Sequence, residues 1–256
     1  MNIIEDILAR LFIAVIFLSI AFAIAYKNRR YDLIDSFWGA TFVVITLVGL
    51  ANISSAAFVM SLLVIVWGMR LSYHILRRFL KSREEDKRYV HLRQNWRGNI
   101  TLNMFLRVYI VQAILATIIC ISIIVLQHAK LEWSWPVWLG IGVWAVGFFF
   151  ETVGDAQLRR HLSVRRNKGK LMTSGLWRYT RHPNYFGEAT MWWGIWIATL
   201  ATPFWWIALL SPLLITYLLL FVSGAPMTEK AFEGRPGWAE YKARTSIFLP
   251  MPPKKV

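Results

Sequence analysis

Hydrophobic residues are gathered into seven long runs, and most charged residues lie between these runs. Each run is close to the ~20 residues that an α-helix needs to cross the ~30 Å hydrocarbon layer of a membrane. The runs cover approximately residues 7–26, 34–50, 55–76, 102–127, 134–154, 184–201 and 203–223. The pattern therefore predicts an all-α integral membrane protein with seven transmembrane helices, forming a single polytopic domain over residues 1–256.

Lysine and arginine are distributed unevenly over the segments that connect the runs. The segments after the first, third, fifth and seventh runs hold 3, 8, 8 and 6 of them, at residues 27–35, 77–101, 156–186 and 224–256. The intervening connections hold almost none. Since cytoplasmic loops of membrane proteins are enriched in basic residues, the sequence predicts an amino terminus outside and a carboxy terminus in the cytoplasm.

The composition supports the membrane class, with 57% hydrophobic residues and 14 Trp. A net charge of +15 would favour a nucleic-acid partner in a soluble protein, but loop asymmetry accounts for it here. We therefore expect membrane lipids, and no nucleic acid, as partners.

The single cysteine, Cys120, excludes an intrachain disulfide and a cysteine-based metal site, and no metal ligands are predicted. Residues 77–101 carry both signs of charge and predict an amphipathic helix or surface loop beside anionic lipid.

A polar and aromatic stretch, residues 175–188 (GLWRYTRHPNYFGE), separates the fifth and sixth runs. Pro183 suits the first turn of a helix, because its missing N–H would be unpaired there anyway. The amino end of that helix, together with Arg178, Arg181 and His182, predicts a site for phosphate or carboxylate oxygens. The alternative is a loop that only anchors the helix to lipid head groups. The residues alone leave both open.

Candidate polar partners lie just upstream of this stretch. Asp155 and Arg159 are four residues apart at the end of the fifth run, so they share a helix face. They could pair with each other, or Asp155 could accept hydrogen bonds from a cofactor while Arg159 binds a phosphate. Lys168 lies in a basic, glycine-containing loop that suits a 2′-phosphate or pyrophosphate, and equally anionic lipid. Joined to residues 175–188, the loop favours NADPH over S-adenosylmethionine, which carries no phosphate.

These motifs resemble the carboxy-terminal half of the steroid 5α-reductase superfamily, and most of all its bacterial branch. The resemblance covers roughly residues 145–250, including the tail 236–241 (PGWAEY), and adds a short pattern at residues 32–39. The core 181–185 (RHPNY) is also similar to the isoprenylcysteine carboxyl methyltransferases, which bind S-adenosylmethionine in a membrane scaffold. The resemblance implies a multi-pass protein of a bacterial inner membrane.

Resemblance to the reductases implies that residues 131–256 bind NADPH and that residues 1–130 form the substrate-side helices. The candidate cofactor-binding residues are Asp155, Arg159, Lys168, Arg178, Tyr179, Arg181, His182, Asn184, Tyr185 and Glu229. Asn184 and Glu188 are expected near the nicotinamide. A similar tail closes over the cofactor in both families, which places Glu229 nearest the site.

The reductase resemblance also implies the chemistry. Members reduce a carbon–carbon double bond conjugated to a ketone in a lipophilic small molecule: hydride goes to the β carbon, and an acidic group stabilises the enolate at the carbonyl oxygen. Steroid reductases use a Glu and a Tyr on early helices for that oxygen. This chain departs from that pattern, and the nearest substitutes are Asp35 with Tyr31 or Tyr73. The predicted catalytic residues are Asp35, Tyr73 and Glu188.

Three functions therefore follow from the sequence. The first is an NADPH-dependent reductase of a steroid-like or isoprenoid enone. The second is an S-adenosylmethionine-dependent methyltransferase of a lipid or isoprenoid. The third is a non-enzymatic membrane protein, such as a lipid-binding subunit or a transporter, whose basic loops are only topological signals. The oligomeric state is left open.

Overall fold

The structure, a computed structural model, describes residues 2–94 and 96–254. Helices make up 75% of it, and the described residues contain no strand, only one parallel bridge between Thr180 and Ser246. Six helical segments are long and apolar enough to cross a membrane: Ile3–Asn28, Tyr31–Val48, Ser55–Lys81, Ile100–Ile119, Trp135–Ser163 and Trp205–Lys230. The prediction of an all-α, multi-pass membrane protein is confirmed.

The run at residues 184–201 corresponds to α9 (Pro183–Thr199), which has 17 residues. At 1.5 Å per residue it is roughly 26 Å long, slightly less than the ~30 Å hydrocarbon layer. Among the described residues, α9 is thus shorter than the six segments that are long enough to span.

The run at residues 102–127, expected as one helix, is interrupted twice. After α5 (Ile100–Met104), the stretch Phe105–Ile110 is π-helical, and regular α-helix resumes as α6 (Val111–Ile119). α6 ends at Cys120 and α7 (Ile121–His128) follows. A hydrophobic run does not record such interruptions, because a π-helical turn changes the hydrogen-bond register without exposing polar side chains.

The chain divides into two compact units. Unit 1 comprises Met1–Ser134 and Thr199–Leu210, and unit 2 comprises Trp135–Ala198 and Ser211–Val256. In addition to α5, the π-helical stretch, α6 and α7, unit 1 contains α1 (Ile3–Asn28), a 3-10 turn (Tyr31–Leu33), α2 (Ile34–Val48), α3 (Ser55–Lys81), α4 (Lys87–Gln94) and α10 (Trp205–Ala208). The assignment of residues 1–130 to substrate and 131–256 to cofactor stays a prediction.

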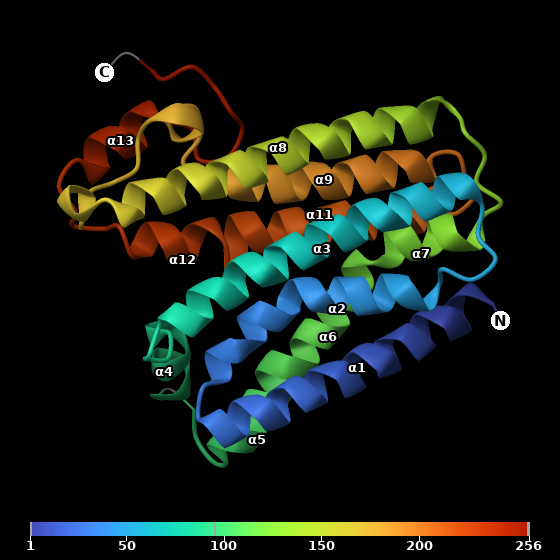
Figure 1. Cartoon of the computed structure of the whole chain (residues 1–256), viewed down its shortest axis with the longest axis horizontal. Helices are drawn as coiled ribbons and strands as arrows, with labels where there is room; N and C mark the ends of the chain where they lie inside the picture. Colours follow the sequence, from blue (N-terminus) through green and yellow to red (C-terminus); the bar gives the residue numbers. More distant parts are fainter. Residues whose placement is uncertain (1, 95, 255–256) are drawn as a thin grey trace. The chain divides into compact units, whose positions relative to one another are not determined.

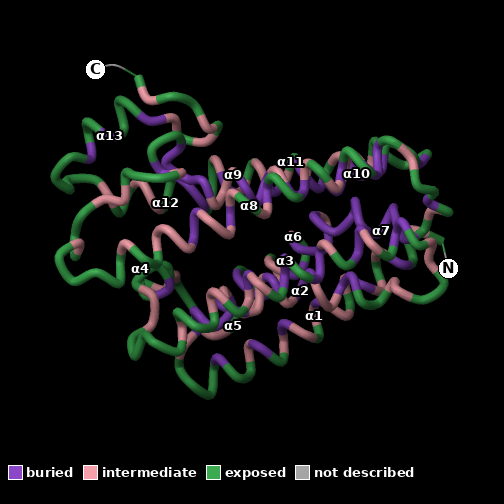
Figure 2. Tube along the Cα trace, turned by 45° about the horizontal axis from the view of Figure 1, so that its top comes forward, coloured by how far each residue is buried: buried purple, intermediate pink, exposed green. Residues whose placement is uncertain are grey.

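α1 presents one lipid-facing stripe and one packed stripe. Between residues 4 and 24, its exposed large apolar residues recur every four positions: Ile4, Leu8, Phe12, Ile16, Ile20 and Ile24. Its buried residues are Asp6, Arg10, Ala14, Leu18, Ala21 and Ala25. The spacing follows the 3.6-residue helical period, so one face meets lipid while the small-residue face packs against α2 and α6. Figure 2 shows this alternation of buried and exposed segments along α1.

A buried polar network lies on the packed stripe of α1. Arg10, 2% exposed, forms a two-point ion pair with Asp6 at 2.9 and 2.6 Å. Its Nη1 also donates to the Ile45 carbonyl oxygen and to Gln127 Oε1, and His128 Nε2 lies 2.8 Å from Asp6 Oδ2. Each charge is thus compensated, as a charge at membrane depth requires. The network ties α1 to α2 and α7.

Unit 2 is built on close contact between two helices, α8 (Trp135–Ser163) and α9 (Figure 1). Three α8 glycines, spaced seven residues apart, meet α9: a Cβ on Gly140 would lie 2.5 Å from the Gly194 oxygen, and one on Gly147 would lie 2.5 Å from the Gly187 oxygen. Gly154 meets Pro183 at 3.1 Å. The unit also contains 3-10 turns at Arg165–Asn167 and Gly175–Arg178, then α11 (Leu210–Tyr217), a π-helical Leu218–Val222, α12 (Ala225–Lys230) and α13 (Trp238–Arg244).

We expect Gly147→Ala to destabilise unit 2, because the new methyl group would overlap backbone atoms of α9 that cannot rotate away. Overpacking of this kind typically costs about 1–3 kcal/mol. Thermal unfolding of the detergent-solubilised protein measures the effect. Gly142→Ala is the matched control, since a Cβ at Gly142 meets nothing within 4 Å. Equal unfolding temperatures for the two variants would contradict the close contact.

Candidate functional site

The polar stretch at residues 175–188 is fastened to the end of α8. Gly175 has a φ of +63°, a conformation that favours glycine, and the next residue, Leu176, donates its backbone N–H to Gln157 Oε1 at 2.9 Å. The indole N–H of Trp177 donates to the Gly154 carbonyl oxygen at 3.1 Å. These bonds fix the loop relative to α8 before α9 begins at Pro183.

The carboxy-terminal tail runs along the same stretch. The backbone N–H of Arg181 donates to the Ser246 oxygen at 2.8 Å, and that of Met251 donates to the Tyr179 oxygen at 2.9 Å. Tyr241 on α13 donates its hydroxyl to the Trp177 oxygen at 2.6 Å. Burial raises the pKa of Tyr241 above its ordinary range, so the hydroxyl keeps the proton that this bond needs. The tail therefore covers one side of the stretch.

Four of the predicted cofactor residues lie together beneath this tail. Arg181 Nε is 2.7 Å from Glu229 Oε1, and His182 Nε2 is 3.3 Å from the same oxygen. The Tyr185 ring stacks on His182 at 5.2 Å between centroids, and its hydroxyl lies 3.1 Å from the Thr228 hydroxyl. These residues form one cluster that joins the start of α9 to α12. Within it, Arg181 and His182 are 48 and 47 positions away from Glu229 in the chain.

Arg181 is buried, and most of its hydrogen-bonding capacity is used inside the chain. Besides Glu229, its guanidinium donates to the Lys242 oxygen at 3.0 Å and to the Thr245 oxygen at 2.6 Å. The Trp238 ring lies 5.7 Å from its carbon Cζ. These contacts hold α13 and the tail against the start of α9.

His182 is 1% exposed, and burial lowers its pKa below the ordinary value of 6.5, although its bond to Glu229 acts in the opposite direction. The folded protein therefore binds a proton at His182 less readily than the unfolded chain does. By proton linkage, neutral His182 makes its full contribution to the stability of the folded protein above about pH 6.5, the ordinary pKa of histidine in the unfolded chain. This contribution is lost as the pH falls from that value towards the lower pKa that His182 has in the folded protein.

We expect the unfolding temperature in detergent to fall between about pH 7.5 and about pH 5, and we expect His182→Gln to show a smaller fall. His161→Gln is the matched control, because the His161 ring bonds the Lys170 oxygen at an exposed position. A fall that is unchanged in His182→Gln would mean that other groups cause it.

Two further predicted residues share a face of α9. Asn184 and Glu188 are one helical turn apart, and Glu188 is 8% exposed. The side-chain oxygen Oδ1 of Asn184 is buried and has no hydrogen-bond partner among the residues that the structure describes. On the facing helix, Asp155 is 8% exposed and follows Gly154, which contacts the first turn of α9. Asn184 therefore offers a buried acceptor to a ligand.

Of the cationic residues predicted to bind phosphate oxygens, Arg181 and His182 are buried and the others lie at the surface. Arg159, Lys168, Arg178 and Tyr179 are exposed. Arg178 lines an open cavity of ≈ 440 Å³ whose other walls include Glu240, Tyr241 and Arg244. A cavity of that size is within the range of small-molecule sites.

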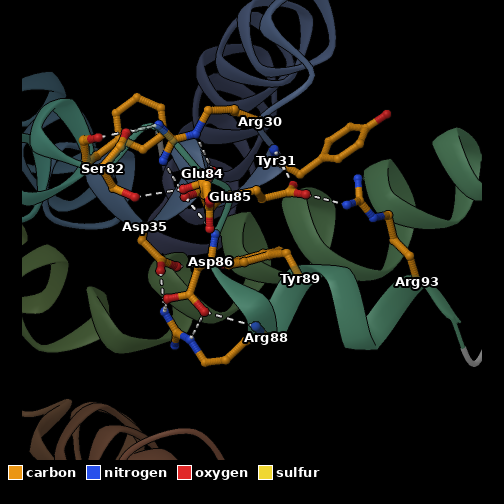
Figure 3. Close-up of polar contacts among 12 residues, drawn as sticks. Arg30, Tyr31, Asp35, Ser82, Glu84, Glu85, Asp86, Arg88, Tyr89 and Arg93 are labelled. Carbon is orange, nitrogen blue, oxygen red and sulfur yellow. Dashed lines mark hydrogen bonds and ion pairs between the residues drawn. The ribbon is translucent and has the colours of Figure 1, made fainter. Parts of the chain in front are cut away.

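The predicted catalytic residue Asp35 lies in unit 1 and has a partner that the sequence did not reveal. Tyr89 on α4 donates its hydroxyl to Asp35 Oδ1 at 2.6 Å, and Arg88 Nη2 is 2.7 Å from Asp35 Oδ2 (Figure 3). Burial, together with the nearby Asp35, raises the pKa of Tyr89 well above its ordinary value. Tyr73 is 66% exposed on α3 and makes no hydrogen bond within the described part of the chain. Asp35 and Tyr89 are thus paired, and Tyr73 is not.

A network of ion pairs brings Tyr89 to this position. Arg30 pairs with Asp32 at 2.8 Å, and Asp32 Oδ2 accepts the backbone N–H of Asp86 at 3.1 Å. Burial alone would raise the pKa of Asp86, but hydrogen bonds from Arg88 lower it below its ordinary value. The segment before α4 is therefore bound to the start of α2 by ionised groups. No periodic signal in the sequence marks this contact, which joins residues 54 positions apart.

A family model described as protein of unknown function (DUF1295) matches residues 21–245. The chain belongs to this family. The family is associated with steroid 5α-reductase-like proteins, which agrees with the motifs at residues 175–188 and 236–241. A search of the curated proteins and a search of the solved structures each gave no match.

The DUF1295 match extends over most of both units and includes both candidate groups. It includes the Asp35–Tyr89 pair and the cluster around Glu229, and it ends at Thr245, whose carbonyl oxygen bonds Arg181. The missed residues Tyr89 and Arg88 lie in the basic segment 77–101, which the sequence assigned to lipid contact. The signal in the sequence that could have indicated this pair is an acidic residue at the start of a helix, Asp35, followed by a tyrosine in the next basic segment, Tyr89.

Proposed function

We propose that the protein is a membrane reductase of the steroid 5α-reductase superfamily, which uses NADPH to reduce a conjugated carbon–carbon double bond in a lipophilic enone. The observation that carries the proposal is the buried, unpartnered oxygen of Asn184. An unsatisfied buried polar atom costs about 1–3 kcal/mol, so such an atom at the start of α9 favours a ligand that donates to it. A nicotinamide carboxamide has two such donors.

The residues of unit 2 fit this cofactor. Asn184 would accept from the carboxamide, with Glu188 one turn further along the same face. Arg178, Arg159 and Lys168 are exposed cations suited to its phosphate groups. The internally paired Arg181, His182 and Glu229 would instead hold the tail that covers the motif. When bound, NADPH supplies the hydride.

For the substrate carbonyl, the proposal uses the Asp35–Tyr89 pair. Tyr89 keeps its proton at neutral pH. In the structure this single proton is donated to Asp35, and a substrate oxygen on which negative charge develops would take over the hydrogen bond when it binds beside the hydroxyl. Asp35 holds this hydroxyl at 2.6 Å, and Arg88 in turn holds Asp35 at 2.7 Å. The sequence predicted Asp35 as the acidic group and Tyr73 as the hydroxyl donor at the carbonyl oxygen. We reassign the role of hydroxyl donor to Tyr89.

We also propose seven spans, with α9 as the additional one, an outer amino terminus and a cytoplasmic carboxy terminus. α9 packs along α8 through its glycines, and a helix a few ångströms short is accommodated by local thinning of the bilayer. With α9 counted, all four basic segments fall on one side, as the positive-inside rule requires.

Cysteine accessibility checks this topology. Cys120 is fully buried, so the native thiol is protected. Arg83→Cys and Arg166→Cys should be labelled from the same side of the membrane, and Ala51→Cys and Ala201→Cys, the latter just after α9, from the opposite side. Labelling of positions 83 and 166 from opposite sides would exclude seven spans.

Mass spectrometry of the small molecule that copurifies with the detergent-solubilised protein tests the function. NADPH or NADP⁺ would support the reductase. S-adenosylmethionine or its demethylated product would replace it with the methyltransferase that resemblance at residues 181–185 suggests. Lipid alone, together with no binding of added NADPH, would favour a non-enzymatic membrane protein.

A further inference from the structure

A second polar cavity, of ≈ 460 Å³, lies in unit 1 at the end of α1. Its walls are Tyr26, Lys27, Arg29, Tyr31 and Arg93. They carry three cations and two phenol groups, and no carboxylate. Cavities of this size hold small molecules or the polar part of a larger one. Apart from Tyr31, none of these side chains has a place in the reductase chemistry proposed above.

The cations of this cavity are not neutralised equally. Arg93 forms an ion pair with Glu85, whose other oxygen accepts the backbone N–H of Tyr31 at 2.8 Å (Figure 3). Lys27 and Arg29, by contrast, make no side-chain hydrogen bond or ion pair within residues 2–94 and 96–254. The cavity thus retains two uncompensated positive charges.

The aromatic walls are held in place by neighbouring rings. Phe22 stacks on Tyr26 at 6.4 Å and on Tyr31 at 6.0 Å between centroids. Tyr109 donates to the Tyr31 carbonyl oxygen at 3.0 Å, and the Arg93 guanidinium lies 5.3 Å from the Tyr31 ring. The two tyrosine hydroxyls have no partner within the described residues, so both can donate. The site is therefore largely preformed, which reduces the entropic cost of binding.

We propose that this cavity binds a phosphate-bearing anion. Lys and Arg are the usual ligands of phosphate oxygens, and phenol hydroxyls add neutral donors. The cavity lies where α1 leaves its apolar span, at the depth of lipid head groups, so the phosphate can belong to an anionic phospholipid or to a soluble phosphate compound. This site goes beyond the proposed reductase activity and does not depend on it.

Two probes distinguish the sources of phosphate. One is phosphatidic acid in nanodiscs of phosphatidylcholine, with the retained lipid counted by native mass spectrometry. The other is pyrophosphate, titrated calorimetrically into the detergent-solubilised protein. Preferential retention of phosphatidic acid identifies a lipid head-group site, and saturable pyrophosphate binding identifies a site for a soluble compound. Failure of both probes would overturn the proposal.

The variant Lys27→Gln/Arg29→Asn tests the location. Asn is chosen at Arg29 because φ there is +56°, a conformation that Asn tolerates. Loss of two charge-assisted bonds should weaken binding about tenfold or more. The matched control, Lys81→Gln/Arg83→Gln, removes the same charge from exposed positions outside the cavity and should change binding less than about twofold.

Tyr31→Phe provides a second variant that removes only one hydroxyl and no charge. It should weaken binding to a smaller extent than the charge variant while the unfolding temperature is unchanged. Equal losses in the two charge variants would show that binding is a general attraction to a basic surface, and they would overturn the site. Equal retention of phosphatidic acid and phosphatidylcholine by the unmodified protein, together with no saturable pyrophosphate binding, would overturn it as well.

Discussion

Replacing Asn184 by alanine should abolish NADPH-dependent hydride transfer and weaken NADPH binding by about tenfold or more, because it removes the buried acceptor proposed for the carboxamide. The same change should leave the ligand-free protein as stable as before, or slightly more stable. The reason is that the lost oxygen has no partner within the described residues, so no hydrogen bond is broken. Binding is measured by energy transfer from tryptophan to bound NADPH, and stability by thermal unfolding with and without the nucleotide.

Thr190→Ala is the matched control on the same helix. The Thr190 hydroxyl donates to the Phe186 oxygen of its own helix at 2.7 Å, so its removal should leave NADPH binding unchanged. If Asn184→Ala kept full NADPH affinity, the carboxamide assignment would be wrong. If it instead destabilised the ligand-free protein strongly, Asn184 would have a structural partner and the argument for a ligand would fail.

Replacing Tyr89 by phenylalanine should lower kcat for a lipophilic enone by about 10²–10³-fold, the usual loss when a donor to a developing oxyanion is removed. Burial and the neighbouring Asp35 keep the hydroxyl protonated in the folded protein, so phenylalanine removes a real donor. NADPH affinity should be unchanged, because the cofactor residues belong to unit 2. Single-turnover oxidation of bound NADPH by a panel of lipophilic enones measures the effect.

Tyr73→Phe is the control for Tyr89→Phe, since it makes the same chemical change at an exposed tyrosine of the same unit. It should retain full activity. Activity lost in Tyr73→Phe and retained in Tyr89→Phe would reverse the assignment of the hydroxyl donor. Asp35→Asn separates orientation from proton supply: it keeps an acceptor for Tyr89 but removes the charge, and we expect a smaller loss than in Tyr89→Phe.

Much of the fold could be predicted from hydrophobic runs alone. A backbone in hydrocarbon must satisfy all its hydrogen bonds within the segment, so a run of about 20 apolar residues has little choice but to form a helix. α1, α3 and α8 accordingly appear close to where the runs placed them. Pro183 was correctly predicted at the start of a helix, because the constraint that proline imposes is local.

The interruptions within the helices could not be predicted from hydrophobic runs. The π-helical stretch at Phe105–Ile110 and the break at Cys120 lie in an uninterrupted apolar run. The seven-residue spacing of Gly140, Gly147 and Gly154 was visible in the sequence, but its meaning required α9 as a partner. In lipid, hydropathy does not distinguish a residue facing a neighbouring helix from one facing the bilayer, since both are apolar.

By itself, the sequence determined the class of protein, six helical segments long enough to span a membrane, the basic segments and the polar motif before α9, because each depends on residues close together in the chain. Only the tertiary structure decided which polar groups meet: Asp35 with Tyr89, Arg181 with Glu229, and Arg10 with Gln127. The partners in these pairs are 48 to 117 residues apart. Charged and polar groups within or beside a membrane need a partner, but any of several distant residues could satisfy that need. The choice is made by how the helices pack and how the loops return, which no local pattern records.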